Sequence, residues 1–119
     1  MNWTVIFYEK ENGEIPVREF LYLLSAKLKA KAIWELRLLR QYGTGLKEPY
    51  TKPMQGDTYK GLWELRIKLG SNASRIFYFL PLENTFVLLH GFVKKSEETP
   101  KRELDIAKRH MEDYRRRFL

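Results

Sequence analysis

The chain lacks cysteine altogether and has only two histidines among its 119 residues. Without cysteine there can be no disulfide, thiolate nucleophile, iron–sulfur cluster or common structural zinc site. With only two histidines, a catalytic metal site with three histidine ligands is also excluded. We therefore expect no metal and no cofactor, and any catalysis would have to come largely from Lys, Arg, Glu, Asp and Tyr.

Long hydrophobic runs are absent too. The longest apolar stretches, 76–82 and 86–93, are far shorter than the roughly 18 residues that a membrane helix needs. The first residues, MNWTVIFYEKE, show neither the basic start nor the apolar length of a signal peptide. We expect a cytoplasmic protein with no membrane partner.

Positive charge, by contrast, is abundant. There are 22 Lys and Arg residues against 15 Asp and Glu, which gives a net charge of +7. Only two of these bases lie in the first 20 residues, which carry four acids. A hydrophobic content of 44% argues against a disordered chain. The excess of bases over residues 21–119 suggests a polyanionic partner such as nucleic acid, a ribosome or an acidic protein. The alternative is a basic surface that serves only solubility.

The order of predicted elements indicates an α+β fold in a single domain over 1–119. A β-branched and aromatic strand (3–8) precedes a helix that opens at Pro16 and a second helix over 26–42 that stops at Gly43. After a connection over 44–58, three strands are predicted at 62–69, 74–81 and 85–95, with a turn at 70–73. A last helix follows, with Thr99 as N-cap and Pro100 at its first position.

This β-α-α-β-β-β-α order predicts a small, mostly antiparallel sheet with the two N-terminal helices on one face and a C-terminal helix. In 62–69, apolar residues alternate with Glu64, Arg66 and Lys68, which would therefore share the opposite face. We expect that second face to be an open, concave working surface.

Basic side chains from separate strands converge on that surface in the predicted meander. Arg75 opens the next strand, and Lys94 and Lys95 end the last one. Clustered cations repel each other, so an external anion would resolve the cost, and a phosphodiester suits Arg and Lys best. The 2′-OH of RNA is a nucleophile that the substrate itself supplies. The protein would then need only to orient the backbone, stabilise charge on phosphorus and move protons.

The candidate residues fall into two groups. Catalytic candidates are Glu64, Arg66, Arg75, His90, Lys94 and Lys95; candidates for binding RNA or phosphate are Tyr59, Lys60, Lys68 and Tyr78. Simpler interpretations remain open for several of them. Arg66 and Lys68 would suit any solvent face, and His90 inside an apolar strand would suit a core. A basic DNA-binding regulator is a weaker alternative, because no major-groove helix is evident.

Several blocks in a fixed order resemble a known family. They are "GLWELRIKLGSNASRIFYF" (61–79) and "FVLLHGFVKKSEETPKRELDIAKRHMEDY" (86–114), with "VREFLYLL" (17–24) and "LRLLRQYG" (36–43) before them. The chain resembles the HigB-type toxins of bacterial type II toxin–antitoxin systems, in the phage-derived branch of the RelE/ParE superfamily. The resemblance covers about residues 2–114.

The resemblance implies a small sheet with two N-terminal helices on one face and a ribosome-dependent mRNA endoribonuclease. Such enzymes cleave without metal, through 2′-OH attack, to a 2′,3′-cyclic phosphate and a 5′-OH. The implied phosphate binder is Arg75, and Arg66, Lys68 and either Lys94 or Lys95 match basic positions of the family. Glu64 and His90 fall where some relatives carry acid–base groups, and the roles stay open.

The implied partners are the ribosome, mRNA and a helix-turn-helix antitoxin of the HigA type. The alternative is a non-cleaving binding toxin on the same fold, either an inhibitor of gyrase or an inactive relative.

Overall fold

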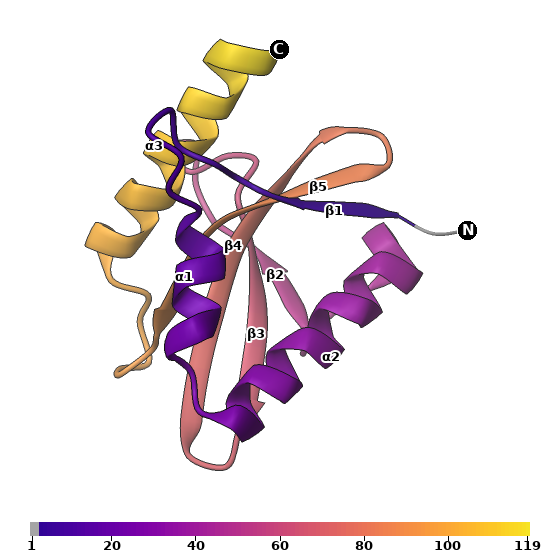
Figure 1. The fold of residues 1–119 in the computed structure, drawn as a ribbon, viewed down its shortest axis with the longest axis vertical. Coiled ribbons are helices and arrows are strands. Elements are labelled where there is room, and N and C mark those ends of the chain that lie inside the picture. Colours follow the sequence, from indigo (N-terminus) through magenta and orange to yellow (C-terminus); the bar gives the residue numbers. More distant parts are fainter. Residues whose placement is uncertain (1–2) are drawn as a thin grey trace.

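A five-stranded mixed sheet forms the centre of the computed structural model, which describes residues 3–119 (Figure 1). In spatial order the strands are β1 (Thr4–Phe7), β5 (Thr85–Val93), β4 (Asn72–Leu82), β3 (Trp63–Leu69) and β2 (Thr51–Pro53). β1 runs parallel to β5, and the other neighbours are antiparallel. The α+β class and the order of the main elements are as predicted. The three-residue strand β2 lies inside the segment that was predicted to be a connection.

Helices α1 (Pro16–Leu23) and α2 (Ala26–Tyr42) follow β1; α1 begins at Pro16 and α2 spans 26–42, both as predicted. Pro16 stands at the first position of α1, where its missing N–H has no partner to lose. The Ser25 hydroxyl accepts a hydrogen bond from the Leu28 amide and caps α2. Gly43 ends α2 with φ +55° and begins a short 3₁₀ turn, Gly43–Gly45.

The β3–β4 hairpin is tighter than predicted. Leu69 pairs with Asn72, so the turn consists of Gly70 and Ser71 rather than four residues. Gly70 has φ +61°, which a residue with a side chain rarely adopts. The short turn fixes the register of the two strands, and therefore decides which side chains stand opposite one another.

The pairing of β5 with β4 contains a bulge. Leu88 pairs with Tyr78 and His90 with Phe77, which leaves Leu89 as the extra residue. The bulge changes the phase of the strand, so that His90 and Phe92 lie on the face that Val87 occupies before it. Gly91 then faces α1, where any Cβ would clash with the Phe20 ring.

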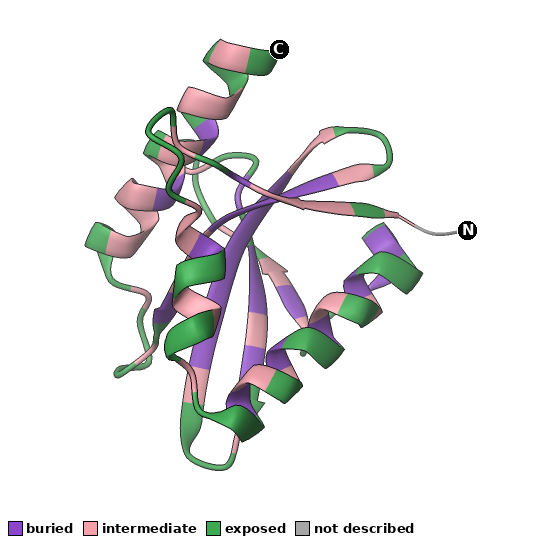
Figure 2. Cartoon of the chain, viewed as in Figure 1, coloured by how far each residue is buried: buried purple, intermediate pink, exposed green. Residues whose placement is uncertain are grey.

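The buried residues are concentrated on the central strands of the sheet (Figure 2). The sheet is covered on both faces, and each face has its own apolar core. α1 and α2 cover one face, over residues that include Leu65, Ile67 and Ile76. α3 (Lys101–Phe118) packs on the other face against β4 and β5, with Ala107 and Met111 buried. The expectation of an open second face is therefore wrong in part: α3 closes the β4–β5 side of that face.

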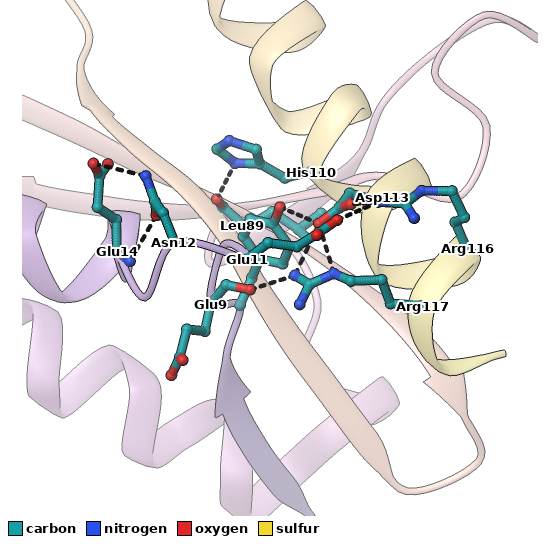
Figure 3. Close-up of polar contacts among 10 residues, drawn as sticks. Glu9, Glu11, Asn12, Glu14, Leu89, His110, Asp113, Arg116 and Arg117 are labelled. Carbon is teal, nitrogen blue, oxygen red and sulfur yellow. Dashed lines mark hydrogen bonds and ion pairs between the residues drawn. The ribbon is translucent and has the colours of Figure 1, made fainter.

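Polar contacts hold the end of α3 to the segment after β1 (Figure 3). The Tyr8 hydroxyl donates to Asp113 Oδ2 at 2.6 Å, and Arg117 Nη2 lies 2.8 Å from the same carboxylate oxygen. The Arg116 guanidinium bonds Glu11 Oε1 at 2.7 Å. The pKa of Asp113 is lowered to about 2, chiefly by the Tyr8 hydrogen bond, while burial raises the pKa of Tyr8 to about 12.

The beginning of α3 differs from the prediction. The helix starts at Lys101, and Pro100 occupies the N-cap position without a side-chain cap bond. Thr99 is not the N-cap, because its hydroxyl donates to Glu64 in β3. Among the described residues, no helix is both long enough and apolar enough to cross a lipid bilayer.

Candidate functional site

The strand register gathers charged side chains on the part of the sheet that α3 leaves uncovered. Lys52 of β2 pairs with Glu64 of β3, and Arg66 pairs with Arg75 of β4. Directly opposed residues project from the same face of a sheet. Lys94 directly follows β5, and its backbone N–H donates to the Ala73 carbonyl at 2.7 Å. Ala73 lies two residues before Arg75 and therefore on the same face of β4, so Lys94 stands next to these charged residues.

Glu64 stands at the centre of this group and is only 2% exposed. Its Oε2 lies 3.5 Å from Arg66 Nε, and its Oε1 lies 3.4 Å from Arg75 Nε. The Thr99 hydroxyl donates to Oε1 at 3.2 Å. One buried carboxylate thus orients two arginines from adjacent strands and binds the segment that leads into α3.

The two guanidinium groups retain hydrogen-bonding capacity. The Nε atoms of Arg66 and Arg75 are within ion-pair distance of Glu64, yet both are buried and have no hydrogen-bond acceptor among the described residues. A buried donor without an acceptor is costly. An anion bound here would relieve part of that cost, since Arg presents several donors in a planar fork.

Lys94 completes the set of charges. Burial lowers its pKa; the carboxylate of Glu64 opposes this, and the positive charges of Arg75, Arg66 and Lys52 add to it. Burial also lowers the pKa of Arg75. We call Glu64 and the four cations around it, Lys52, Arg66, Arg75 and Lys94, the cation cluster. Its four positive charges face a single carboxylate, so the site has an excess of positive charge and suits a polyanion.

The comparison with protein families gives a match over most of the chain. Residues 19–112 match the family described as phage derived protein Gp49-like (DUF891). The chain belongs to this family. No curated protein matches it. All five residues of the cation cluster lie inside the range that defines it as Gp49-like, whereas β1 and the last turns of α3 lie outside.

His90 of this Gp49-like chain lies outside the cation cluster. Its Nε2 is 2.7 Å from Glu103 Oε1 on α3, and its ring stacks on Phe77 and Phe92. Phe77 stands between His90 and Glu64 in the register. His90 therefore joins β5 to α3, and its geometry matches the core interpretation better than the catalytic one.

The lysine candidates separate. Lys68 lies on the same face as the cluster, near the exposed hairpin end. Lys95 is exposed and follows Lys94 in the loop, and Lys60 is exposed in the turn before β3. No ion pair among residues 3–119 involves any of the three. Lys94 forms no ion pair within residues 3–119 either, but it is half-buried and close enough to Glu64 for that carboxylate to act on its pKa.

The tyrosine candidates also separate. Tyr78 is buried in the core under α2, stacks on Trp63 and packs edge-on against Phe86. Burial raises its pKa. Tyr59 is half-buried on the α3 side, and its hydroxyl donates to Asp105 Oδ1 at 2.7 Å. Tyr59 therefore stands on the side of the cation cluster, and Tyr78 does not.

Two residues of the site were not among the candidates. Lys52 lies in a strand of three residues that has no visible sequence period, so its pairing with Glu64 could not be expected. Thr99 carried a local signal for a helix cap, and only the packing of α3 brings its hydroxyl to Glu64.

Proposed function

We propose that this protein is the toxin of a toxin–antitoxin pair and acts as a ribosome-dependent mRNA endoribonuclease of the HigB-like kind. The observation that carries the proposal is the cation cluster: four cations around one buried carboxylate, beside the edge of α3. Membership of the Gp49-like family, which is associated with toxin-like proteins of the RelE type, supports it.

The cluster suits binding of the scissile phosphate. The guanidinium groups of Arg66 and Arg75 would hold its non-bridging oxygens, and Lys94 would add a third positive charge. As the 2′-oxygen attacks, negative charge grows on these oxygens, and fixed cations in a partly buried site stabilise that charge more than water does. Lys52 stands where it can hold a neighbouring phosphate of the backbone.

Two groups of the cluster can move protons. The Glu64 carboxylate can accept the proton of the 2′-OH, and the Lys94 ammonium, whose pKa burial lowers, can donate one to the departing 5′-oxygen. The bond from the 2′-oxygen to phosphorus forms while the bond from phosphorus to the 5′-oxygen breaks. The products are a 2′,3′-cyclic phosphate and a free 5′-OH.

A protein partner is part of the proposal, in the form of a helix-turn-helix antitoxin. Large apolar side chains are exposed on the two N-terminal helices, including Tyr22, Leu23, Ile33 and Trp34. Exposed apolar patches of this kind are typical of interaction surfaces. They lie on the opposite side of the sheet from the cation cluster.

Induction of the chain in growing cells, followed by mapping of mRNA ends, tests the proposal. We expect new ends inside translated codons and loss of those ends when translation initiation is blocked. Intact mRNA together with a DNA-damage response would instead favour a gyrase inhibitor, and intact mRNA without it would favour an inactive or purely binding relative. Arg75→Ala, produced at an equal level, is the matched variant and should abolish the cuts.

A further inference from the structure

An open hollow lies beside the cation cluster, between the turn before β3 and the segment that leads into α3. Its volume is about 530 Å³, within the range of small-molecule sites. Tyr59, Pro100 and Leu104 supply apolar walls, while Thr58, Ser96, Glu98, Thr99 and Lys101 supply polar atoms. Such a lining, with an aromatic wall and polar atoms around it, suits a flat, partly polar ring.

Thr99 connects the hollow to the cluster. Its side chain lines the hollow, and its hydroxyl donates to Glu64 Oε1. Glu64 in turn contacts both arginines. The hollow and the arginines are therefore linked through Thr99 and Glu64, so a phosphate on the arginines and a ring in the hollow would lie close to each other.

Tyr59 is held in place before any ligand binds. Its hydroxyl donates to Asp105 Oδ1 at 2.7 Å, and Asp105 Oδ2 lies 2.8 Å from Lys101 Nζ. The ring also packs against the apolar core under α3. A tyrosine fixed at both ends loses little conformational freedom when another ring stacks on it.

We propose that this hollow is a nucleobase subsite for single-stranded RNA, in which Tyr59 stacks on the base next to the phosphate held by the cation cluster. The inference rests on the proposed function, because it assumes that the bound phosphate belongs to RNA. Stacking on an aromatic side chain accepts any base, so Tyr59 contributes affinity, and Thr99 and Glu98 stand where they can select among bases.

The test uses a fluorescein-labelled RNA hexamer that is fully 2′-O-methylated, so that it cannot be cut, and the same hexamer with one abasic position moved along it. Binding is measured by fluorescence anisotropy with the full chain. We expect one abasic position to weaken binding to the wild type by about tenfold. Tyr59→Ala should weaken binding of the intact hexamer by a similar factor and should be insensitive to that abasic position.

Two variants separate stacking from folding. Tyr59→Phe keeps the ring and loses the bond to Asp105, so its affinity should stay within about threefold of the wild type. Tyr22→Ala removes an exposed tyrosine from α1, on the opposite side of the sheet, and should leave the affinity for the RNA hexamer unchanged. If Tyr59→Ala fails to fold, the abasic series on the wild type still decides the matter.

The proposal is overturned if the wild type does not bind the hexamer, if no abasic position weakens binding, or if the effects of Tyr59→Ala and the abasic site multiply. Cleavage of cellular mRNA by the wild type is measured in parallel. Cleavage with no effect of the abasic positions would reject the subsite alone, whereas absence of both cleavage and binding would reject the proposed function.

Discussion

At the scale of single residues, Glu64 organises the site. It is buried, yet it faces two guanidinium groups and receives a hydrogen bond from Thr99. Removing one partner from a buried group of charges leaves the others uncompensated, which is destabilising. Glu64 therefore serves both the fold and the proposed chemistry, and its variants must be assayed for both.

Glu64→Gln keeps the shape of the side chain and removes its charge. We expect a lower melting temperature, because the four cations lose their only partner within the cluster. Binding of a non-cleavable RNA should be unchanged or tighter, while cleavage should fall by about 100-fold or more through loss of the proton acceptor. A folded Glu64→Gln protein that cleaves within twofold of the wild type would contradict this role.

Lys94 and Lys95 offer a matched pair, since both lose one positive charge on substitution by alanine. Lys94 is the lysine of the cluster, and Lys95 is exposed beyond it. Lys94→Ala should lower the cleavage rate by about 100-fold, as loss of one group that stabilises a transition state does. Lys95→Ala should lower it by less than about threefold. Equal losses in the two variants would place the active cations elsewhere.

At the scale of elements, the contacts of α3 with the segment after β1 fix how much of the sheet is covered. The helix buries β4 and β5, and its first residues border the cation cluster through Thr99. At its far end, Tyr8 and Arg117 converge on Asp113. A shift of α3 would therefore disturb the hydrogen bond between Thr99 and Glu64, even though the anchoring contacts lie at the other end of the helix.

Tyr8→Phe tests this anchor. Loss of the hydrogen bond to Asp113 should lower the free energy of unfolding by about 1 kcal/mol at pH 7, as measured by urea denaturation. The pKa of Asp113 is depressed from 3.8 to about 2, so its contribution is present above pH 4 and is lost as the pH falls towards 2. The difference between Tyr8→Phe and the wild type should shrink over that window.

Tyr22→Phe serves as the control for this experiment, because Tyr22 is exposed on α1. It should match the wild type at every pH. A difference between Tyr8→Phe and the wild type that stays constant from pH 5 to pH 2 would show that Asp113 does not carry the effect.

At the scale of the whole molecule, the sheet separates two surfaces of different character. One side carries the cation cluster beside α3, and the other carries exposed apolar residues on α1 and α2. A net charge of +7 attracts any polyanion at long range. By contrast, only direct contacts between the cations of the cluster and RNA phosphates should release the counterions bound to those phosphates.

The salt dependence of RNA binding distinguishes the two effects. Single-stranded binding to about four phosphates gives a slope of about −3 for log K against log salt. Lys94→Ala should reduce the magnitude of that slope by about 0.7. Lys27→Ala, at the exposed start of α2, changes net charge equally and should leave the slope unchanged. Equal changes in both variants would indicate diffuse attraction rather than a site.

Local patterns predicted the parts of the site that lie on regular strands. The period of two in β3 placed Glu64 and Arg66 on one face, and the structure agrees. The same rule separates Arg75 from Tyr78, which are three residues apart and therefore lie on opposite faces. The period of two therefore places Arg75 with the site and Tyr78 in the opposite core.

Other parts depended on contacts between distant segments. The bulge at Leu89 turns His90 toward α3, and no local sequence pattern predicts this bulge. Lys52 belongs to a strand that exists only because β3 pairs with it. Thr99 had a plausible local role as a helix cap, and tertiary packing overrode it. The cation cluster is thus partly local in origin and partly a product of the assembled fold.

The most direct test of the proposed function is the chemistry of cleavage on the ribosome. Purified protein is added to ribosomes stalled on an mRNA whose cut codon is either all-ribose or carries one 2′-deoxynucleotide just before the scissile phosphate. The proposed function predicts a 5′-OH and a 2′,3′-cyclic phosphate from the first mRNA and no cut in the second. Cleavage of the deoxy-substituted mRNA at the same position, or 5′-phosphate ends, would contradict it.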